Sequence, residues 1–371
     1  MRFMNTYATG QSTGEAVDSL KKKIGDFPVA NMIFFVSSLF DAEAVAHHIH
    51  DAFPEATTIG CTSYSELYNS TIRSGSISAM AFAPEALDTF AASVVENVST
   101  APNALRDAVE GLERQLGKRL LDLDFHTHFG IGLYDGRSPY IERIMDKIGN
   151  ISDIVMIGGA ASDDFSMEKI RVFHNGRAYQ DAAVLTVVKP SRPFSLLKTQ
   201  SAQPTGISSI ATKVDVAAQT VFELDHRPAA EVYAEAIGVG LDDIRDGHFL
   251  EYAFGIMAEG EPFLRAVRRL LKNGGLQLFC SVLEGQRMCL TRTGDVVETT
   301  AKTLETHRAK LGSIEAVLDF DCAHRDLSLQ SAITRNQYAQ LFDGIKATGF
   351  STFGELYIAT VNQTAVMALF S

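Results

Sequence analysis

A nine-residue segment in the first fifth of the chain recurs near its C-terminus. The two copies, Gly60-Cys-Thr-Ser-Tyr-Ser-Glu66-Leu-Tyr68 and Gly349-Phe-Ser-Thr-Phe-Gly-Glu355-Leu-Tyr357, are identical at four positions and similar at three more. Each copy follows an apolar run and a helical pattern, and each precedes another strand-like run. The sequence therefore predicts a repeated unit of strand, helix, glycine-rich turn carrying an acid, and strand.

A weaker third copy lies in the middle of the chain. Residues 128–134 have the pattern of a strand, 138–148 that of a helix and 154–157 that of a second strand. This strand runs into Gly158-Gly-Ala-Ala-Ser-Asp-Asp164-Phe165. When the copies are aligned on their first glycine, Asp164 falls where Glu66 stands. We therefore predict three copies of the unit, each with an acid after its glycine turn.

The alternation of strand and helix patterns predicts an α/β fold with mixed α+β layers. The length of 371 residues favours two to three domains. A boundary is expected at Lys189-Pro-Ser-Arg-Pro193, where two prolines end a strand pattern. We predict two related halves, residues 1–192 and 193–371, which contain the repeated unit.

Charge and composition exclude several classes of protein. The chain has 33 basic and 45 acidic residues, and its longest basic run is the triplet 21–23, so we expect no nucleic-acid partner. Its apolar runs are far shorter than the ~20 residues of a membrane span, and no signal peptide is evident, so we expect no membrane insertion. Four cysteines without a Cys-x-x-Cys spacing are typical of a reducing cytoplasm.

The sequence contains one short pattern typical of hydrolases. Gly10-Gln-Ser12-Thr-Gly14 matches the nucleophile elbow of serine hydrolases. Ser12 and Glu15 also fit a capping box at a helix start, and we favour this interpretation. Since no complete set of catalytic residues accompanies Ser12, we do not expect the chain to be an enzyme. A hydrolase ranks third among our three hypotheses for the function.

Four segments, taken in order, resemble the FIST sensory family: 60–66, 158–164, Asp225-His-Arg-Pro228-Ala, and 349–355 followed by Asn362-Gln-Thr364. The resemblance covers nearly the whole chain, as a FIST N domain and a FIST C domain. It implies a cytoplasmic sensor in signal transduction that binds a small molecule or gas. One branch of the family senses nitric oxide through haem and regulates histidine kinases of two-component systems and cyclic-di-GMP enzymes.

The resemblance implies that output passes to a separate histidine kinase or cyclic-di-GMP enzyme, because no such segment follows Ser371. A homo-oligomer is a further option. The glycine–acid motifs supply the candidate ligand-binding residues, whose backbone N–H groups and carboxylates could hold an amine or hydroxyl. The acids could equally cap turns and fix the geometry of the repeat. The candidates are Gly60, Cys61, Thr62, Glu66, Gly158, Gly159, Asp164, Gly349, Ser351, Thr352, Glu355 and Asn362.

If haem b is bound, His174 is our candidate for the iron ligand. It ends a strand-like run before Asn175-Gly176, a hairpin signal, with 182–188 as the expected return strand. Phe173 and Tyr179 could form aromatic walls, although Phe173 and His174 point to opposite faces of a strand. His128 and Cys61 are the alternative ligands. A sensor of a metabolite such as an amino acid, without haem, is the second hypothesis.

Overall fold

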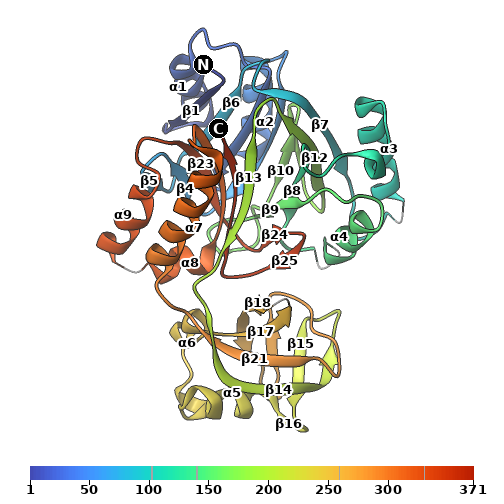
Figure 1. The fold of residues 1–371 in the computed structure, drawn as a ribbon, viewed down its shortest axis with the longest axis vertical. Coiled ribbons are helices and arrows are strands. Elements are labelled where there is room, and N and C mark those ends of the chain that lie inside the picture. The colour runs from blue at the N-terminus through green and yellow to red at the C-terminus, as the bar shows by residue number, and fades with distance from the viewer. Residues whose placement is uncertain (102, 139–140, 259, 330) are drawn as a thin grey trace.

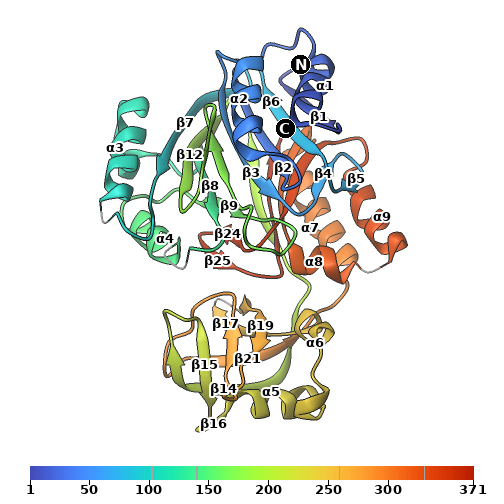
Figure 2. The ribbon, with the colours of Figure 1, turned by 180° about the vertical axis from the view of Figure 1, so that it is seen from behind.

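The computed structural model describes residues 1–101, 103–138, 141–258, 260–329 and 331–371. A larger body contains both chain termini, and a smaller body lies beside it (Figure 1). The view from behind shows the same two connections between them, one after β13 and one before α7 (Figure 2). Among the described residues, no helix is both long and apolar enough to cross a bilayer.

The larger body consists of three copies of one unit, which confirms the predicted repeat and its third copy. Unit 1 comprises β1 (Phe3–Ala8), α1 (Thr13–Ile24), β2 (Asn31–Ser37), α2 (Ala42–Ala52), β3 (Thr57–Ser63), β4 (Glu66–Tyr68), β5 (Thr71–Arg73) and β6 (Ile77–Phe82). Unit 2 comprises β7 (Leu87–Val95), α3 (Ala104–Leu116), the 3-10 helix η1 (Leu120–Asp122), β8 (Phe129–Asp135), α4 (Ile141–Gly149), β9 (Met156–Ala161), β10 (Val172–His174), β11 (Arg177–Tyr179) and β12 (Ala183–Pro190). Unit 3 comprises β13 (Phe194–Thr199), α7 (Val296–Leu311), β22 (Ala316–Cys322), α8 (Ala323–Ser328), α9 (Ala332–Gln340), β23 (Lys346–Thr352), β24 (Glu355–Tyr357), β25 (Ala359–Val361) and β26 (Ala365–Phe370).

The smaller body is inserted into unit 3 between β13 and α7, and we call it the inserted body. Its strands, which differ in length, form one sheet, and two short helices accompany this sheet. It comprises β14 (Gln203–Asp215), β15 (Thr220–Leu224), β16 (Arg227–Pro228), α5 (Ala229–Ile237), the 3-10 helix η2 (Leu241–Asp243), α6 (Asp246–Glu251), β17 (Tyr252–Ala258), β18 (Glu261–Arg265), β19 (Val267–Leu270), β20 (Leu276–Leu278) and β21 (Arg287–Arg292). The predicted boundary at 192/193 falls between β12 and β13, where unit 2 ends.

Each unit completes the sheet of another unit. The three sheets have the orders β1-β6-β2-β3-β10-β11, β7-β12-β8-β9-β24-β25 and β13-β26-β22-β23-β4-β5. In each sheet, one parallel pair (β2 with β3, β8 with β9, β22 with β23) is followed by a hairpin from a different unit. This cyclic exchange of hairpins ties the three units into one body.

The inner faces of the three sheets share one apolar core, to which Phe35, Phe129 and Phe320 contribute from different units. The outer faces are covered by helices, with α1 and α2 on the first sheet, α3 and α4 on the second, and α7 and α9 on the third. The mixed α+β fold class is thus confirmed.

Glycine is needed at the first position of each copy for a different structural reason from the one we expected. Gly60, Gly158 and Gly349 lie inside β3, β9 and β23, where we expected turns. A Cβ atom at Gly158 would lie 2.1 Å from the carbonyl oxygen of Gly132 on the neighbouring strand. At Gly60 and Gly349 the corresponding distances to the neighbouring strand are 2.3 and 2.4 Å. Close approach of a parallel strand therefore requires glycine at this position.

The register of the exchanged hairpins corrects the alignment of the third copy. Gly60 pairs with Phe173, Gly349 with Leu67 and Gly158 with Leu356. One residue earlier in each hairpin stand Glu66, Val172 and Glu355, so the equivalent of Glu66 in unit 2 is Val172, and the alignment with Asp164 was wrong. The cause is the longer loop of unit 2, which spans 162–171 where units 1 and 3 have two residues.

The capping interpretation of Ser12 is confirmed. Its hydroxyl oxygen accepts a hydrogen bond from the backbone N–H of Glu15 at 3.3 Å, at the N-terminus of α1. The Glu15 carboxylate in turn accepts from the backbone N–H of Gln11 at 3.0 Å. Ser12 thus satisfies one orphan helix donor, as a capping residue does, and Glu15 fixes the residue that precedes the cap.

Candidate functional site

A cavity of about 440 Å³ lies between the larger body and the inserted body. The larger body lines it with residues that follow the carboxyl ends of β8, β9, β22 and β23, and the inserted body lines it with Gln219 and the segments around 266–268 and 279–280. Pockets of this size, with mixed apolar and polar walls, are typical of small-molecule sites. This cavity is therefore the candidate site.

Aromatic side chains form much of its wall. Phe165 and Phe353 pack with ring centroids 5.1 Å apart. Tyr134 lies beside them and donates from its hydroxyl to the carbonyl of Gly354 at 2.8 Å. On the side of the inserted body, the ring of Phe279 meets the His324 ring edge-on, with centroids 5.0 Å apart. The cavity can therefore hold the apolar part of a ligand.

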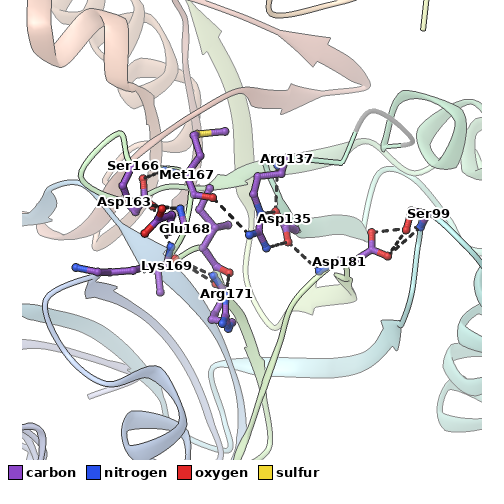
Figure 3. A network of polar contacts seen from close by, with 12 residues as sticks. Ser99, Asp135, Arg137, Asp163, Ser166, Met167, Glu168, Lys169, Arg171 and Asp181 are labelled. Carbon is purple, nitrogen blue, oxygen red and sulfur yellow. Dashed lines mark hydrogen bonds and ion pairs between the residues drawn. The ribbon is translucent and has the colours of Figure 1, made fainter. Parts of the chain in front are cut away.

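The long loop of unit 2 forms one side of the cavity, and a network of polar contacts fixes it (Figure 3). Arg137 donates to both carboxylate oxygens of Asp135, at 2.9 and 2.6 Å, and also to the carbonyl of Met167. Burial alone would raise the pKa of Asp135, but the hydrogen bonds from Arg137 hold it below its ordinary value. The charge of Arg137 is thus largely neutralised before any ligand enters.

Asp163 is the acid that organises this loop. Its carboxylate accepts from the hydroxyl of Ser166 and from the backbone N–H groups of Met167, Glu168 and Lys169 (Figure 3). The predicted residue, Asp164, is half-exposed and forms an ion pair with Lys169 at 3.7 Å. Asp163 therefore has a positioning role, and the sequence pattern had pointed to the residue after it.

Two cavity residues of opposite charge stand without a charged partner among the described residues. The Arg268 guanidinium lies 5.9 Å from the centroid of the Phe279 ring, and although Arg268 is exposed, partial desolvation lowers its pKa. Glu142 accepts, at its Oε1 atom, from the backbone N–H of Ser281 at 3.1 Å and from the hydroxyl of Thr360 at 3.0 Å. A ligand that carries both an anionic and a cationic group would match this pair.

His324 and two thiols complete the polar lining. Burial lowers the pKa of His324 to about 4, so its imidazole is neutral at pH 7, and its buried Nδ1 atom has no hydrogen-bond partner. Burial raises the pKa of Cys280 to about 11 and that of Cys322 above its ordinary value. Both are therefore protonated thiols rather than reactive thiolates. In the described part of the chain, no three His, Cys, Asp or Glu side chains are placed to hold a metal ion.

The predicted site residues are divided between this cavity and the interior of the larger body. Thr352 and Asn362 line the cavity. The Asn362 Oδ1 atom accepts from the backbone N–H of Ala266 at 3.4 Å and from the Cys280 thiol at 3.2 Å. The remaining candidates are not among its lining residues: Gly60, Cys61, Thr62, Glu66, Gly158, Gly159, Asp164, Gly349, Ser351 and Glu355.

Thr62 and Ser351 lie where the three units interlock. The backbone N–H of Thr62 donates to the carbonyl of Arg171, and that of Ser351 donates to the carbonyl of Ser65, both at 2.9 Å. The equivalent residue of unit 2, Ala160, donates to Gly354 at 2.8 Å. These three equivalent bonds each join a strand to a hairpin of another unit. The backbone N–H groups of this segment are therefore already used in hydrogen bonds that join the units.

Glu66 and Glu355 are buried, and each makes hydrogen bonds that stabilise its own unit. Each carboxylate accepts from the backbone N–H and hydroxyl of the residue that precedes the last strand of its unit, Ser76 for Glu66 and Thr364 for Glu355. Burial raises the pKa of Glu66 to about 7 and that of Glu355 to about 8, against these hydrogen bonds. This geometry matches the interpretation in which the acids fix the repeat.

The raised pKa of Glu355 predicts a pH-dependent stability. Between the ordinary glutamate value of 4.5 and about 8, the folded protein retains a proton that the unfolded chain releases. Stability should therefore fall as the pH rises through this window, by up to about 1.4 kcal/mol per pH unit. Glu355→Gln should reduce the fall between pH 7 and 8, as measured by urea unfolding, by more than Glu66→Gln does. An unchanged slope in Glu355→Gln would contradict this assignment.

His174 lies in the hairpin that unit 2 contributes to the first sheet, away from the candidate cavity. Asn175-Gly176 forms its turn as predicted, but the return strand is β11 rather than 182–188, which pairs with β7 and β8 instead. Phe173 stacks on Phe34 beneath the outer helices, whereas Tyr179 packs against the inner core. Burial lowers the pKa of His174. The two expected aromatic walls thus lie on opposite faces of the sheet.

Five important cavity residues were not predicted: Arg137, Glu142, Arg268, Cys280 and His324. Arg268 and Cys280 belong to the inserted body, which lies outside the repeat. Arg137 and His324 follow the carboxyl ends of β8 and β22, the places where α/β sheets present binding residues. Their position after a predicted strand was the available signal.

Comparison with known proteins gives matches along most of the chain. The sequence model of the FIST N domain matches residues 31–227, and that of the FIST C domain matches residues 229–357. A curated protein of Methanocaldococcus jannaschii, uncharacterized protein MJ1623, is 26% identical over 222 residues, which cover 56% of this chain and 42% of that protein. The match thus spans less than half of the relative.

Two solved structures of cyanuric acid hydrolase are weakly similar. The enzyme from A. caulinodans is 9% identical with a TM-score of 0.34, covering 100% of this chain and 99% of that chain. A second cyanuric acid hydrolase structure is 8% identical with a TM-score of 0.29, covering 79% of this chain and 99% of that chain. Scores this low support no conclusion about activity.

Proposed function

Since the chain belongs to the FIST family, whose domains are sensory domains of signalling proteins, we propose that it senses a small amino-acid-like metabolite in the cavity between its two bodies. The observation that carries the proposal is the pair Arg268 and Glu142, which line one cavity and have no charged partner among the described residues. A zwitterion supplies a carboxylate for Arg268 and an ammonium group for Glu142.

The rest of the lining supports an amino acid over a purely ionic ligand. Phe165, Phe279 and Phe353 offer apolar surface for a side chain. Neutral His324 and the amide of Asn362 can exchange hydrogen bonds with a ligand without adding charge. The cavity therefore suits a small molecule with charged ends and an apolar or aromatic body.

Isothermal titration with the twenty proteinogenic L-amino acids tests this proposal. At least one should bind, and Arg268→Ala should weaken its binding by about 10- to 100-fold, the effect of losing a charge-assisted hydrogen bond. Arg269→Ala is the matched control, because Arg269 bonds Gln277 at 2.8 Å and is not a lining residue. Absence of heat with every amino acid, or equal losses in both variants, would overturn the proposal.

Partner and location follow from the family resemblance alone. We propose that the chain acts in the cytoplasm and passes its signal to a separate histidine kinase or cyclic-di-GMP enzyme. It performs no catalysis of its own under this proposal. Co-purification of such an enzyme with the chain, dependent on the bound metabolite, is the expected result.

A haem-based sensor of nitric oxide is the second candidate function. His324 favours it, since its imidazole is neutral, its Nδ1 atom is orphaned and it lines the cavity. His324 would then hold the iron, in place of His174, and bound haem would supply the coordination of the gas. An absorption spectrum after expression with haem supply separates the two candidates. A Soret band that shifts in His324→Ala supports haem, whereas the metabolite proposal expects no Soret band.

A further inference from the structure

The inserted body is a separate module with its own core. Its apolar cluster, built around Tyr233, Phe254 and Leu276, contains only residues between 211 and 290. The four clusters of the larger body contain none of these residues. Two short segments, one after β13 and one before α7, connect the two bodies (Figure 1). Bodies joined in this way, without a shared apolar core, move relative to each other by default.

Individual polar contacts hold the inserted body in place over the cavity. Glu142 accepts from the N–H of Ser281, and Asn362 accepts from the N–H of Ala266. Gln363 donates from its Nε2 atom to the carbonyls of Phe249 and Leu250, at 3.1 and 3.4 Å. Lys198, on β13, forms an ion pair with Glu261 of β18 at 3.0 Å.

Gln363 occupies a position that favours glycine. In each unit, the next residue along the chain accepts a hydrogen bond at its carbonyl oxygen from the backbone N–H at the end of a central strand. These acceptor residues are Ser76, Ala182 and Thr364. The preceding residues, Gly75, Asp181 and Gln363, all have left-handed backbone, with φ of 74°, 47° and 53°. A glutamine in this conformation is strained where glycine is not. A compensating contact is therefore expected, and the Gln363 side chain makes it to the inserted body.

We propose that the inserted body is a hinged lid over the cavity and that Gln363 is the positioning residue that holds the lid closed. The proposal rests on the proposed function, because a ligand between the bodies contacts both of them and favours the closed position. Movement of the lid is then the change that a signalling partner detects. Asn362, next to Gln363, contacts the lid and lines the cavity, and so joins the ligand site to the hinge contact.

The first experiment needs no ligand. Amide hydrogen exchange at Ala266 and Ser281 reports lid closure, since both N–H groups bond across the junction. Gln363→Gly should accelerate exchange at both amides by about five-fold or more, because the variant loses both hydrogen bonds of the Gln363 side chain. Gln363→Glu keeps the length of the side chain but presents carboxylate oxygens to two carbonyls, so it should open the lid as well.

Asp181→Gly is the matched control. It relieves the same left-handed strain at the equivalent position of unit 2, where the side chain bonds Ser99 and not the inserted body. Exchange at Ala266 and Ser281 should be unchanged in this variant. Unaltered exchange in both Gln363 variants would overturn the lid proposal. An increase in Asp181→Gly equal to that in the Gln363 variants would overturn it as well.

The second experiment adds the L-amino acid that gives the largest heat in the titration. In the unaltered chain it should slow exchange at Ala266 and Ser281, and Gln363→Glu should bind it more weakly. If no amino acid binds, the proposed function fails while the first experiment still decides whether the lid exists. If an amino acid binds and leaves both amides unchanged, the lid does not report occupancy and the proposal is overturned.

Discussion

Replacing Arg325 with alanine is expected to lower the free energy of unfolding by about 3–5 kcal/mol, because it leaves a buried carboxylate without its cation. The Arg325 side chain is 2% exposed. It donates to Asp321 at 2.6 Å and to the hydroxyl of Thr300 at 3.0 Å. Asp319 lies beside this pair, and burial followed by repulsion from Asp321 raises its pKa well above the ordinary value. Arg325 is thus the cation that keeps this acidic cluster folded.

Urea unfolding at pH 7 measures the effect, and Arg119→Ala is the control. Arg119 pairs with Asp122 at 2.8 Å, but the two side chains are 67% and 48% exposed, so its loss should have little effect on stability. Adding Asp321→Asn to Arg325→Ala should restore part of the stability, since the orphaned charge is removed. Equal losses in the two arginine variants would contradict this role of Arg325.

Gly158→Ala is expected to destabilise the chain by about 3 kcal/mol, through steric overlap together with backbone strain. The added Cβ atom would lie 2.1 Å from the carbonyl oxygen of Gly132, and the residue has a φ of 136°. The obstacle is a backbone atom of a paired strand, so no side-chain rearrangement relieves it. Thermal and urea unfolding measure the loss.

Gly117→Ala is the control for backbone strain alone. Gly117 has a φ of 66°, and no heavy atom lies within 4 Å of the position that an added methyl group would take, so the cost should be about 1 kcal/mol. Gly60→Ala should resemble Gly158→Ala, because the neighbouring carbonyl of Phe34 lies 2.3 Å from the Cβ position. A loss no greater than that of Gly117→Ala would show that the strands separate easily.

Local patterns in the sequence were sufficient to predict the repeat, since strands, helices and caps depend on neighbouring residues. The capping role of Ser12 and the fold class followed in this way. The exchange of hairpins was not predicted, because pairing of Glu66 with Phe350 joins residues far apart in the chain. The assignment of Asp164 failed for a related reason, as an alignment without gaps misses the longer loop of unit 2.

The candidate cavity was less accessible to sequence analysis than the fold. Its charged residues, Arg268 and Glu142, come from different bodies and carry no motif. Motif residues such as Gly60 and Glu355 recur because the fold of each unit depends on them. Recurrence in the sequence therefore indicated structural positions and not the ligand site. Asn362 was found because it lies in a motif that also joins the inserted body to the larger body.

A crystal structure of the chain with the L-amino acid that gives the largest titration heat tests the proposed ligand site most directly. We predict electron density in the cavity, with the ligand carboxylate about 3 Å from the Arg268 guanidinium and its ammonium group facing Glu142. Density for the amino acid at any other place, such as the hairpin of His174, would contradict the proposed site.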